Sequence, residues 1–469
     1  MKIALTCILL FTCSFSFAEK TIPVTVDQRV ELLSIVFRLA GNPEYNTNFA
    51  KSYVGDINTY FAKYKSYAVI EYARKLAEEK GIGYSKVMFL AVHLAWLNNK
   101  FSLIREKENT LEYWDIKDAE RFVALLNVFY KDSKFQLFFA RHRTFYTAAI
   151  QQFNNVLNDF DQKWYQDYYG GPAAEEYKIV IGLSNGGGNF GPNVHPLNQK
   201  KIVYAVMGSW TYNDDGKPLF AKEDYQPTLV HEFNHSFINH LLDEDGNAAK
   251  IKANGDTLLA AEKQEMKDGG YENWKSLINE SLVRASVIRY MIDHKSGDQI
   301  TDAEIMEQTN EGFIWISDLV NLLGNYESSR SEYPAFKDFY PRIITFFDIT
   351  ASNITQIKAN YMAKQPKIIS ITPFNNNAQD VDPSLQEMAI NFDSEIKGNG
   401  GGVRPGELGK EHIAVTKLLG YENNNRSFKL ALSLKPDTEY EFVVRGSQFK
   451  SSEGYFLQEY TVRFKTAAR

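Results

Sequence analysis

The sequence predicts an α+β protein, in which a largely helical region with a small β-sheet is followed by an all-β segment. Apolar residues recur at helical spacing over most of residues 26–167 and again over about 227–360. Two short runs rich in β-branched residues, 177–183 and 201–207, lie between these stretches and predict strands. After residue 365 the apolar period changes to two, which predicts short alternating strands. A chain of 469 residues exceeds what one core usually holds, so two or three domains are expected.

The composition narrows the class of function. Hydrophobic residues make up 44% and aromatic residues 14% of the chain, which indicates large buried cores rather than disorder. The formal net charge is −6, so the chain has no basic footprint for nucleic acid. An acidic chain also gives no reason to expect adhesion to anionic lipid.

The first 18 residues predict a secretory signal peptide. Lys2 supplies a positive charge, an apolar run follows over residues 3–17, and Ser16 and Ala18 are small residues at the −3 and −1 positions of a cleavage site. The run is too short to span a bilayer, and no other apolar run is long enough. We therefore expect export to the periplasm, the cell surface or the medium, without a transmembrane segment.

Both cysteines, Cys7 and Cys13, lie inside this predicted signal. The mature chain would then contain no disulfide, and its cores alone would stabilise it. Lipidation at Cys13 is the competing interpretation. Bulky Phe11 and Thr12 fit a lipoprotein cleavage box poorly, and apolar residues continue beyond Cys13.

The aromatic-rich helices of the N-terminal region are expected to form a packed layer rather than a cofactor site. Gly41 can end the first of them, because glycine commonly terminates helices. The pattern predicts further helices at about 48–80, 83–98, 117–131 and 134–168, and, after the two strands, at about 227–242, 273–294, 302–323 and 335–360.

A glycine-rich loop, residues 185–193, joins the two predicted strands. Gly186, Gly188 and Gly191 fit G-x-G-x-x-G literally, which is the dinucleotide-binding pattern. Pro192 and a polar loop follow the third glycine, however, where a dinucleotide site needs a helix N-terminus for the pyrophosphate. We therefore exclude a dinucleotide site.

The last hundred residues have the pattern of a β-sandwich. Apolar residues alternate with polar or small neighbours around 388–392, 428–434 and 460–464, and turn residues separate these runs. The predicted domains are 19–362 and 366–469, with the boundary near 363–367.

Two stretches of this segment resemble the bacterial Ig-like domains found at the ends of exported proteins. They are ITPFNNNAQDVDPSLQEMAINFDSEI (371–396) and LKPDTEYEFVVRGSQFKSSEGYFLQEYTVRFKT (434–466). The resemblance covers nearly the whole segment. It implies a structural spacer, or a module that contacts protein or glycan, and it implies no chemistry.

Three of the eight histidines fall within residues 231–240. His231 and His235 are spaced i, i+4, which on a helix puts both imidazoles on one face, able to share one ion. Glu232 is offset by about 100° from His231, so it can reach a water on that ion rather than the ion itself. Pro227 is expected in the first turn of this helix. Two core histidines bonded to the backbone would show the same spacing, so a third ligand decides between the two interpretations.

A third histidine in the pattern HExxHxxGxxH is absent. Ile238 and Leu241 stand where that pattern has its glycine and its last histidine. His240 does not substitute, because it lies about 180° around the helix axis from His231. Catalytic zinc usually has three protein ligands and one open position, so the third must come from elsewhere.

Glu280, on a later and strongly apolar helix, can supply the third ligand. A buried carboxylate needs a partner, and a metal is a strong one. The alternative partner of Glu280 is Arg284, four residues further on the same helix. Competing ligands, in a more polar stretch of the chain, are Glu262, Glu265 and Glu272.

The runs LVHEFNHSFIN (229–239) and NESLVRA (279–285) resemble the gluzincin group of zinc metallopeptidases. The resemblance is closest to an uncharacterised family of exported bacterial gluzincin-like proteins with an Ig-like tail. The matching motif is short relative to the chain, and the group permits the long spacing to Glu280. The resemblance implies a zincin-like fold and a Zn²⁺ ion on His231, His235 and Glu280, with Glu232 as general base and acid in the hydrolysis of peptide or protein substrates.

The resemblance also implies that an edge strand beside the metal helix, here 201–207, pairs with an extended substrate, although an ordinary sheet strand is the alternative. Two other functions stay open: a catalytically inactive zincin-like binding or surface-scaffold protein, and a zinc amidase or esterase. Candidates for a donor to the developing oxyanion are Tyr225, Tyr271, His195, His240, Tyr333 and Tyr340.

Overall fold

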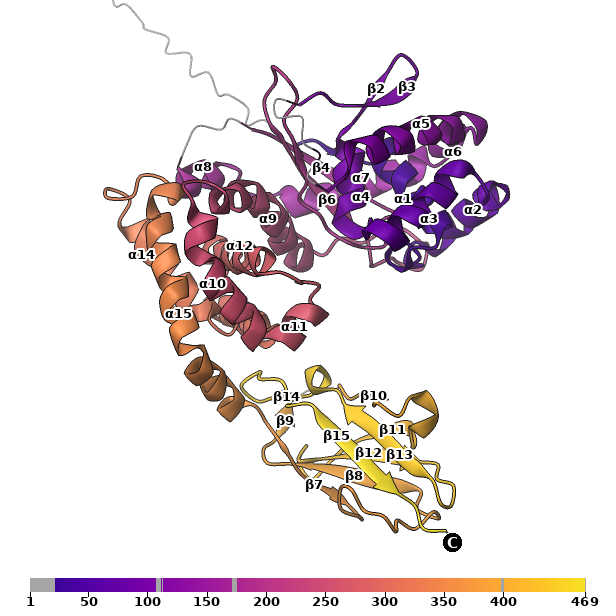
Figure 1. The fold of residues 1–469 in the computed structure, drawn as a ribbon, viewed down its shortest axis with the longest axis vertical. Helices are drawn as coiled ribbons and strands as arrows, with labels where there is room; N and C mark the ends of the chain where they lie inside the picture. Colours follow the sequence, from indigo (N-terminus) through magenta and orange to yellow (C-terminus); the bar gives the residue numbers. More distant parts are fainter. Residues whose placement is uncertain (1–21, 107–110, 112, 171–174, 398–399, 469) are drawn as a thin grey trace, which may run out of the picture. The chain divides into compact units, whose positions relative to one another are not determined.

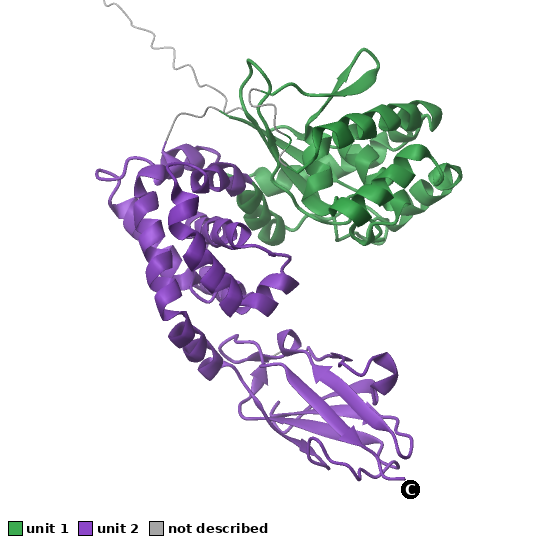
Figure 2. Cartoon of the chain, in the orientation of Figure 1, with its two compact units in different colours: residues 1–160, 173–232 green, residues 161–172, 233–469 purple. Residues whose placement is uncertain are grey.

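The computed structural model describes residues 22–106, 111, 113–170, 175–397 and 400–468, so the predicted signal peptide with both cysteines lies outside the described residues. Helices dominate and the strands form small sheets, which confirms the predicted α+β class (Figure 1). The chain divides into two compact units: unit 1 is residues 1–160 and 173–232, and unit 2 is residues 161–172 and 233–469 (Figure 2). The division falls inside one continuous helix, α9 (Lys222–Ile238).

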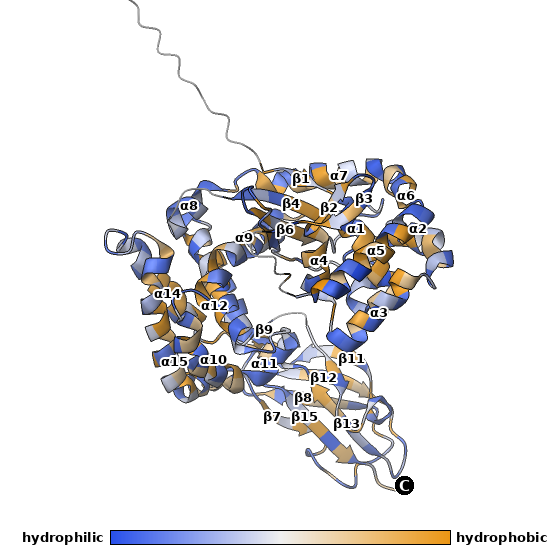
Figure 3. Cartoon of the chain, turned by 45° about the horizontal axis from the view of Figure 1, so that its top comes forward, coloured by the Kyte–Doolittle hydropathy of each residue, from blue (hydrophilic) through white to orange (hydrophobic). Residues whose placement is uncertain are grey.

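Unit 1 contains a four-stranded sheet with the order β1-β4-β6-β5. The strands β1 (Val24–Thr25), β4 (Glu176–Gly182) and β6 (Ile202–Gly208) are parallel, whereas β5 (Asn193–Val194) is antiparallel to β6. The two long strands, β4 and β6, are those that the β-branched runs predict. Most of their side chains are buried, and both strands are largely hydrophobic in Figure 3. The sequence pattern does not predict β1 or β5, because two residues carry no periodicity.

The expectation that residues 201–207 form an edge strand is wrong. β6 pairs with β4 on one side. On its other side, Val206 and Phe190 exchange two backbone hydrogen bonds of 2.8 and 2.9 Å, and the N–H of Tyr204 donates to the carbonyl of Pro192 at 2.9 Å. The segment 190–194 therefore covers β6 and takes the edge position. This segment was missed because glycine and proline interrupt any strand pattern there.

Helix α1 (Gln28–Ala40) contacts β4. It begins at Asp27, whose carboxylate accepts from the N–H of Arg29, and it ends at Gly41, which has the left-handed φ of +99° that glycine adopts readily. The other helices of unit 1 are α2 (Lys51–Phe61), α3 (Ala68–Lys80), α4 (Tyr84–Val92), α5 (Ile116–Asp132), α6 (Phe135–Arg141) and α7 (Arg143–Asn154), with single 3₁₀ turns at Pro43–Tyr45, Ala62–Tyr64 and Asn155–Leu157.

A β-hairpin replaces the second half of the helix expected at 83–98. Its strands are β2 (Leu94–Leu97) and β3 (Lys100–Leu103), which pair in antiparallel fashion. Asn98 and Asn99 form the two-residue turn, with φ of +52° and +60°. Asparagine tolerates positive φ better than most residues, and an Asn-Asn pair between apolar runs was the signal available in the sequence.

A buried carboxylate fixes the start of the glycine-rich loop. Glu31 on α1 is fully buried and accepts hydrogen bonds from the N–H of Leu183 at 2.8 Å and the hydroxyl of Ser184 at 2.7 Å. The hydroxyl of Tyr53 donates to the same carboxylate at 2.9 Å. Burial raises the pKa of Glu31, and these three donors oppose the rise. The loop after β4 is thus held to α1 by several bonds at once.

The first part of unit 2 is helical, and two of its helices differ from the expectation. The single helix expected at 302–323 is two helices, α13 (Asp298–Asn310) and α14 (Ile316–Ser328), because Gly312, with φ of +96°, lies between them. Helix α9 starts earlier than expected, so Pro227 lies inside it rather than in its first turn. The helices of unit 2 that accompany α9 are α8 (Lys163–Tyr169), α10 (Asn247–Ala261), α11 (Lys263–Asp268), α12 (Trp274–Asp293), α13 (Asp298–Asn310), α14 (Ile316–Ser328) and α15 (Phe336–Lys364), with a 3₁₀ turn at Asn239–Leu242.

The C-terminal part of unit 2 is all-β. One sheet has the order β11-β12-β8-β7 and another has the order β10-β13-β15, and both are antiparallel. Apolar side chains from the two sheets form one core, which includes Ile390, Leu430, Phe442 and Phe464. The strands are β7 (Ile368–Thr372), β8 (Glu387–Phe392), β9 (Ile396–Lys397), β10 (Val403–Pro405), β11 (Val415–Glu422), β12 (Ser427–Leu432), β13 (Glu439–Val444), β14 (Lys450–Ser451) and β15 (Tyr460–Lys465), with 3₁₀ turns at Lys410–His412 and Gly446–Gln448.

Candidate metal centre

The first two predicted ligands come from α9. Leu229, Val230 and Phe233 on this helix are fully buried. His231 and His235 lie one helical turn apart, and both are partly exposed. The apolar side chains anchor the helix, while the partial exposure of the two imidazoles leaves them accessible from one side.

The third predicted ligand comes from α12. This helix begins at Asn273, whose side chain accepts from the N–H of Ser276 at 3.0 Å. Leu277 and Ile278 are fully buried, and Glu280 is only 9% exposed. The apolar sequence of α12 therefore carries a carboxylate into the interior, where it needs a partner.

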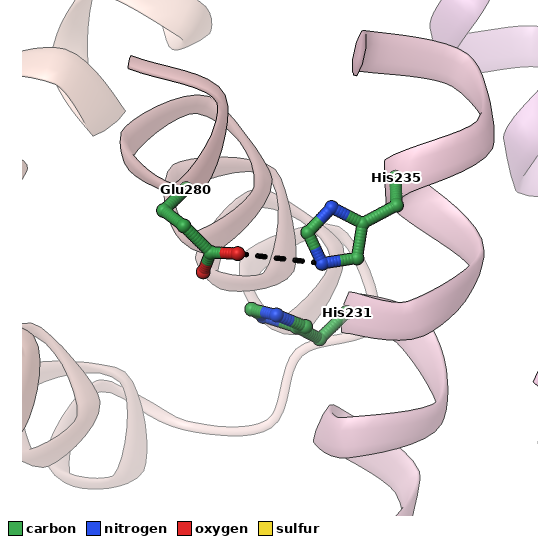
Figure 4. A group of neighbouring side chains, drawn as sticks. All are labelled: His231, His235 and Glu280. Atoms are coloured by element: carbon green, nitrogen blue, oxygen red, sulfur yellow. Dashed lines mark ion pairs between the residues drawn. The ribbon is translucent and has the colours of Figure 1, made fainter. Parts of the chain in front are cut away.

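His231, His235 and Glu280 point toward one another (Figure 4). Each offers one ligand atom, and these atoms all lie within 4.8 Å of one another. Nε2 of His235 is 3.5 Å from Oε1 of Glu280. Both residues belong to unit 2, and the continuous helix α9 fixes His231 relative to His235. Ligand atoms about 2.0–2.1 Å from a tetrahedral zinc ion lie about 3.3 Å from one another, close to the 3.5 Å between His235 and Glu280, so this group could hold one metal ion.

The two carboxylate oxygens of Glu280 have different partners. Oε1 faces His235, whereas Oε2 accepts from the hydroxyl of Tyr271 at 3.1 Å and from Nε of Arg284 at 3.4 Å. The sequence left two alternatives for Glu280: an ion pair with Arg284, or a position beside the histidines. In the structure both occur together. Burial alone would lower the pKa of Arg284, but attraction to Tyr271, Glu280 and Glu311 raises this pKa above its ordinary value, so the guanidinium stays charged.

Two asparagines that sequence reasoning did not single out position the histidine helix. Oδ1 of Asn239 lies 3.3 Å from Nδ1 of His235. With its proton on Nδ1, the imidazole would donate to this oxygen and would leave Nε2 to bind an ion. The fully buried Asn234 accepts from the hydroxyl of Tyr169 at 2.9 Å and donates to the carbonyl of Val283 at 3.4 Å. Asn234 thereby links α9 to α8 and α12. A polar residue between the two histidines and an asparagine at i+4 were the signals in the sequence.

Glu232 follows the first histidine and is 6% exposed. The glycine-rich loop lies against it, because a Cβ built on Gly191 would be 2.3 Å from the carbonyl oxygen of Glu232 and 3.2 Å from its Oε2. Phe190 and Pro192 bond to β6, so the backbone N–H and C=O of Gly191 between them point away from β6, toward the open edge of the sheet. The sequence identified Gly191 only as part of a rejected dinucleotide motif.

The other candidate ligands and the candidate oxyanion donors have different surroundings from the three clustered residues. Glu262 is buried and pairs with Lys358 at 3.1 Å, while Glu265 and Glu272 are exposed. Among the oxyanion candidates, Tyr271 contacts Glu280, Tyr225 and Tyr340 are buried, Tyr333 packs on Phe339, and His195 and His240 are exposed.

The fold and the site together define an α+β protein with a candidate metal centre on two packed helices. Residues 22–346 match the model of a family described as a domain of unknown function, DUF4932. This match covers more than half of the chain, which therefore belongs to that family. No curated protein matches the chain.

Two solved structures of a surface-layer protein match the chain. Domains 1–6 of surface layer protein SbsC are 14% identical, with a TM-score of 0.17, over 51% of this chain and 33% of that one. The crystal structure of the S-layer protein rSbsC(31-844) is 13% identical, with a TM-score of 0.16, over 93% of this chain and 46% of that one. The chain thus spans between a third and a half of the length of these two proteins. TM-scores this low carry no inference about fold or function.

No helix among the described residues is both long enough and apolar enough to span a membrane.

Proposed function

We propose that this protein is an exported zinc-dependent metallopeptidase with a gluzincin-like site. The observation that carries this proposal is the cluster of His231, His235 and Glu280 beside Glu232. Structural zinc sites usually have four protein ligands, whereas three ligands and an open position are typical of catalytic sites. The partial exposure of both histidines supports such an open position.

The proposed architecture has two parts. Residues 19–362 would form a zincin-like domain, in which a small sheet with an antiparallel edge strand precedes the metal helix. Residues 366–469 would form an Ig-like sandwich, which is supported by two antiparallel sheets with a shared core. We assign no chemistry to the second part, which would serve as a spacer or contact protein or glycan.

A bound zinc ion would supply Lewis-acid chemistry, because it lowers the pKa of its water to about 7 and polarises a substrate carbonyl. The carboxylate of Glu232 would accept the proton of the attacking water and pass it to the leaving amine. Gly191 lies against Glu232 and turns its backbone N–H and C=O away from β6, toward the open edge of the sheet. An extended substrate would therefore pair with the segment 190–194 rather than with β6.

The substitution Glu232→Gln tests this function in the purified full chain. We expect one zinc per chain in both proteins, and a fall of at least 100-fold in the cleavage of an unfolded protein such as casein, because general acid–base catalysis contributes about 10²–10⁴-fold. Glu244→Gln is the matched control, since its side chain is 48% exposed and pairs only weakly with His240, at 3.7 Å. This control should keep both zinc and activity.

Other outcomes separate the alternatives. A wild-type chain that binds no zinc, or a Glu232→Gln variant that cleaves as well as wild type, contradicts the proposal. Chelator-sensitive hydrolysis of esters or small amides without peptide cleavage would assign the related hydrolase function. Zinc binding without any hydrolysis would favour the binding or scaffold protein.

A further inference from the structure

We propose that Tyr271 and Arg284 are positioning residues that hold Glu280 so that it binds the metal through one oxygen. The inference rests on the proposed function, because it concerns the ligand geometry of the same site. It adds two residues outside the ligand set and a further helix, α13, that supports them.

The two carboxylate oxygens of Glu280 have different surroundings. Oε1 is 3.5 Å from Nε2 of His235 and therefore faces the metal position. Oε2 has two donors, the hydroxyl of Tyr271 at 3.1 Å and Nε of Arg284 at 3.4 Å. A carboxylate that rotated to bring both oxygens to the metal would leave both donors without their acceptor, in surroundings where such a loss is costly.

The hydroxyl of Tyr271 accepts one hydrogen bond and donates another. Nη2 of Arg284 is 2.8 Å from the Tyr271 hydroxyl. A guanidinium can only donate, so the phenol oxygen accepts this bond and the single phenol proton goes to Glu280. Tyr271 was a candidate donor to the oxyanion, but its proton is already committed to Oε2. The arrangement favours a positioning role over a catalytic one.

Several partners hold the guanidinium of Arg284 in place. Nη1 donates to Oε2 of Glu311 at 2.5 Å and to the side chain of Gln308, both at the C-terminal end of α13. The guanidinium also lies over the ring of Phe313, 4.6 Å from its centre. Because the planar guanidinium has partners on several sides, it acts as a rigid support for the carboxylate.

One-oxygen binding matters for the chemistry of the site. Three ligand atoms from the protein leave one tetrahedral position for water and substrate. A second oxygen from Glu280 would occupy that position or force the metal to a higher coordination number. Residues beyond the ligands typically change metal affinity 10–100-fold when they are removed.

The substitution Tyr271→Phe tests the proposal, because it removes only the hydroxyl and keeps the ring that packs on Phe313. We expect the zinc dissociation constant of the full chain, measured by competition with a chelator, to rise about 10–100-fold. X-ray absorption at the zinc edge should show a higher coordination number in the variant than in wild type. Tyr440→Phe is the matched control, since it also removes the hydroxyl of a buried tyrosine, which accepts from the backbone N–H of Lys435 at 2.7 Å in the C-terminal all-β part. The control should keep wild-type zinc affinity.

Arg284→Lys is the second variant, because it retains the charge but not the fork that joins Glu280 to Tyr271. We expect it to weaken zinc binding as well. Unchanged zinc affinity in Tyr271→Phe overturns the inference, and if its kcat falls while the affinity holds, the hydroxyl is an oxyanion donor instead. A wild-type chain that binds no zinc contradicts the proposed function itself, so the two failures are distinguishable.

Discussion

At the scale of single residues, Gly191 shows how closely the loop surrounds the proposed base. Its backbone approaches Glu232 so nearly that a methyl group would overlap the carbonyl oxygen at 2.3 Å. Glycine is often retained where two backbones approach closely. The need for glycine at this position comes from the contact, since its φ lies outside the left-handed range.

Gly191→Ala should lower the hydrolytic kcat/KM at least about ten-fold while one zinc per chain is retained, because the atoms nearest to the added methyl belong to Glu232, so that Glu232 or the loop is displaced. The measurement is steady-state kinetics with metal analysis of the same sample. Gly55→Ala is the control: it lies in α2 with nothing within 4 Å of the added Cβ, and it should leave activity unchanged and raise stability by about 0.5–1 kcal/mol. Wild-type activity in Gly191→Ala would remove this loop from the site.

The residues of the candidate site differ in how well the sequence predicts them. Spacing on a helix was enough to single out His231, Glu232 and His235, and the apolar neighbours of Glu280 marked it as a buried carboxylate. The positioning role of Tyr271 was not predictable, because it depends on which side chain donates to which oxygen. That information lies in the packing of α12 against its neighbours, and no local pattern encodes it.

At the scale of elements, several single elements were predicted closely, but the breaks inside long helical stretches were not. The helix expected at 48–80 is α2 and α3, and the one expected at 134–168 is α6, α7 and α8. Helix α12 and strands β4 and β6 lie within a residue or two of their expected bounds. The hairpin at 94–103 and the break near Gly312 were missed, because each depends on one or two residues with positive φ. Segment 190–194 was missed because Gly191 and Pro192 interrupt the alternation that marks a strand.

The junction of α10 and α11 carries a buried acid, Glu262, which is 1% exposed. Burial raises the pKa of Glu262 to about 7, against the opposing effect of Lys358. Between the ordinary pKa of about 4.5 and this raised value, an acid of this kind is protonated in the folded protein and ionised in the unfolded chain. Its contribution to stability is therefore fully present below about pH 4.5 and is lost as the pH rises through about 7.

Glu262→Gln should remove that loss. The free energy of unfolding of the variant minus that of wild type should increase by about 3 kcal/mol between pH 4.5 and pH 8. This value follows from a rise of about 2.5 units in the pKa of Glu262, at 1.36 kcal/mol per unit. Urea unfolding at a series of pH values measures this difference. Parallel pH profiles for the two proteins would show that Glu262 titrates normally.

At the scale of the whole molecule, the helices and the C-terminal strands of unit 2 meet at Asn310. Its side chain donates to the carbonyl of Gly454 at 2.9 Å and accepts from the N–H of Phe456 at 3.2 Å and the hydroxyl of Tyr361 at 3.1 Å. Asn310 is 7% exposed and ends α13, the helix that supports Arg284. The β segment is thus bonded to the helical part rather than merely tethered to it.

Asn310→Ala should weaken this contact by about 1 kcal/mol, because it removes the side-chain partner of two partly buried backbone groups, the carbonyl of Gly454 and the N–H of Phe456. Trypsin should then cut faster after Lys364 or Lys367, on either side of the junction, as followed by mass spectrometry. Glu307→Gln is the control, since it breaks only an exposed pair with Lys450 and should change little. Equal cleavage rates in wild type and Asn310→Ala would show that the contact contributes nothing to the docking.

The α+β class and the all-β character of the last hundred residues followed from hydrophobic period alone. The contact of that segment with α13 did not, because a single asparagine at a helix end has no pattern that distinguishes it from any other helix cap. The division of the chain within α9 was equally beyond the sequence, since it depends on how contacts are distributed through the molecule.

The proposed function requires that His231, His235 and Glu280 hold one zinc ion. Anomalous diffraction at the zinc edge, from crystals of the zinc-loaded full chain, tests it most directly. We predict one peak per chain, bonded to Nε2 of His235, to His231 and to a single oxygen of Glu280 at about 2.0–2.2 Å. A peak bound by other residues, or a zinc-loaded crystal with no peak between α9 and α12, would show that these three residues do not form the zinc site.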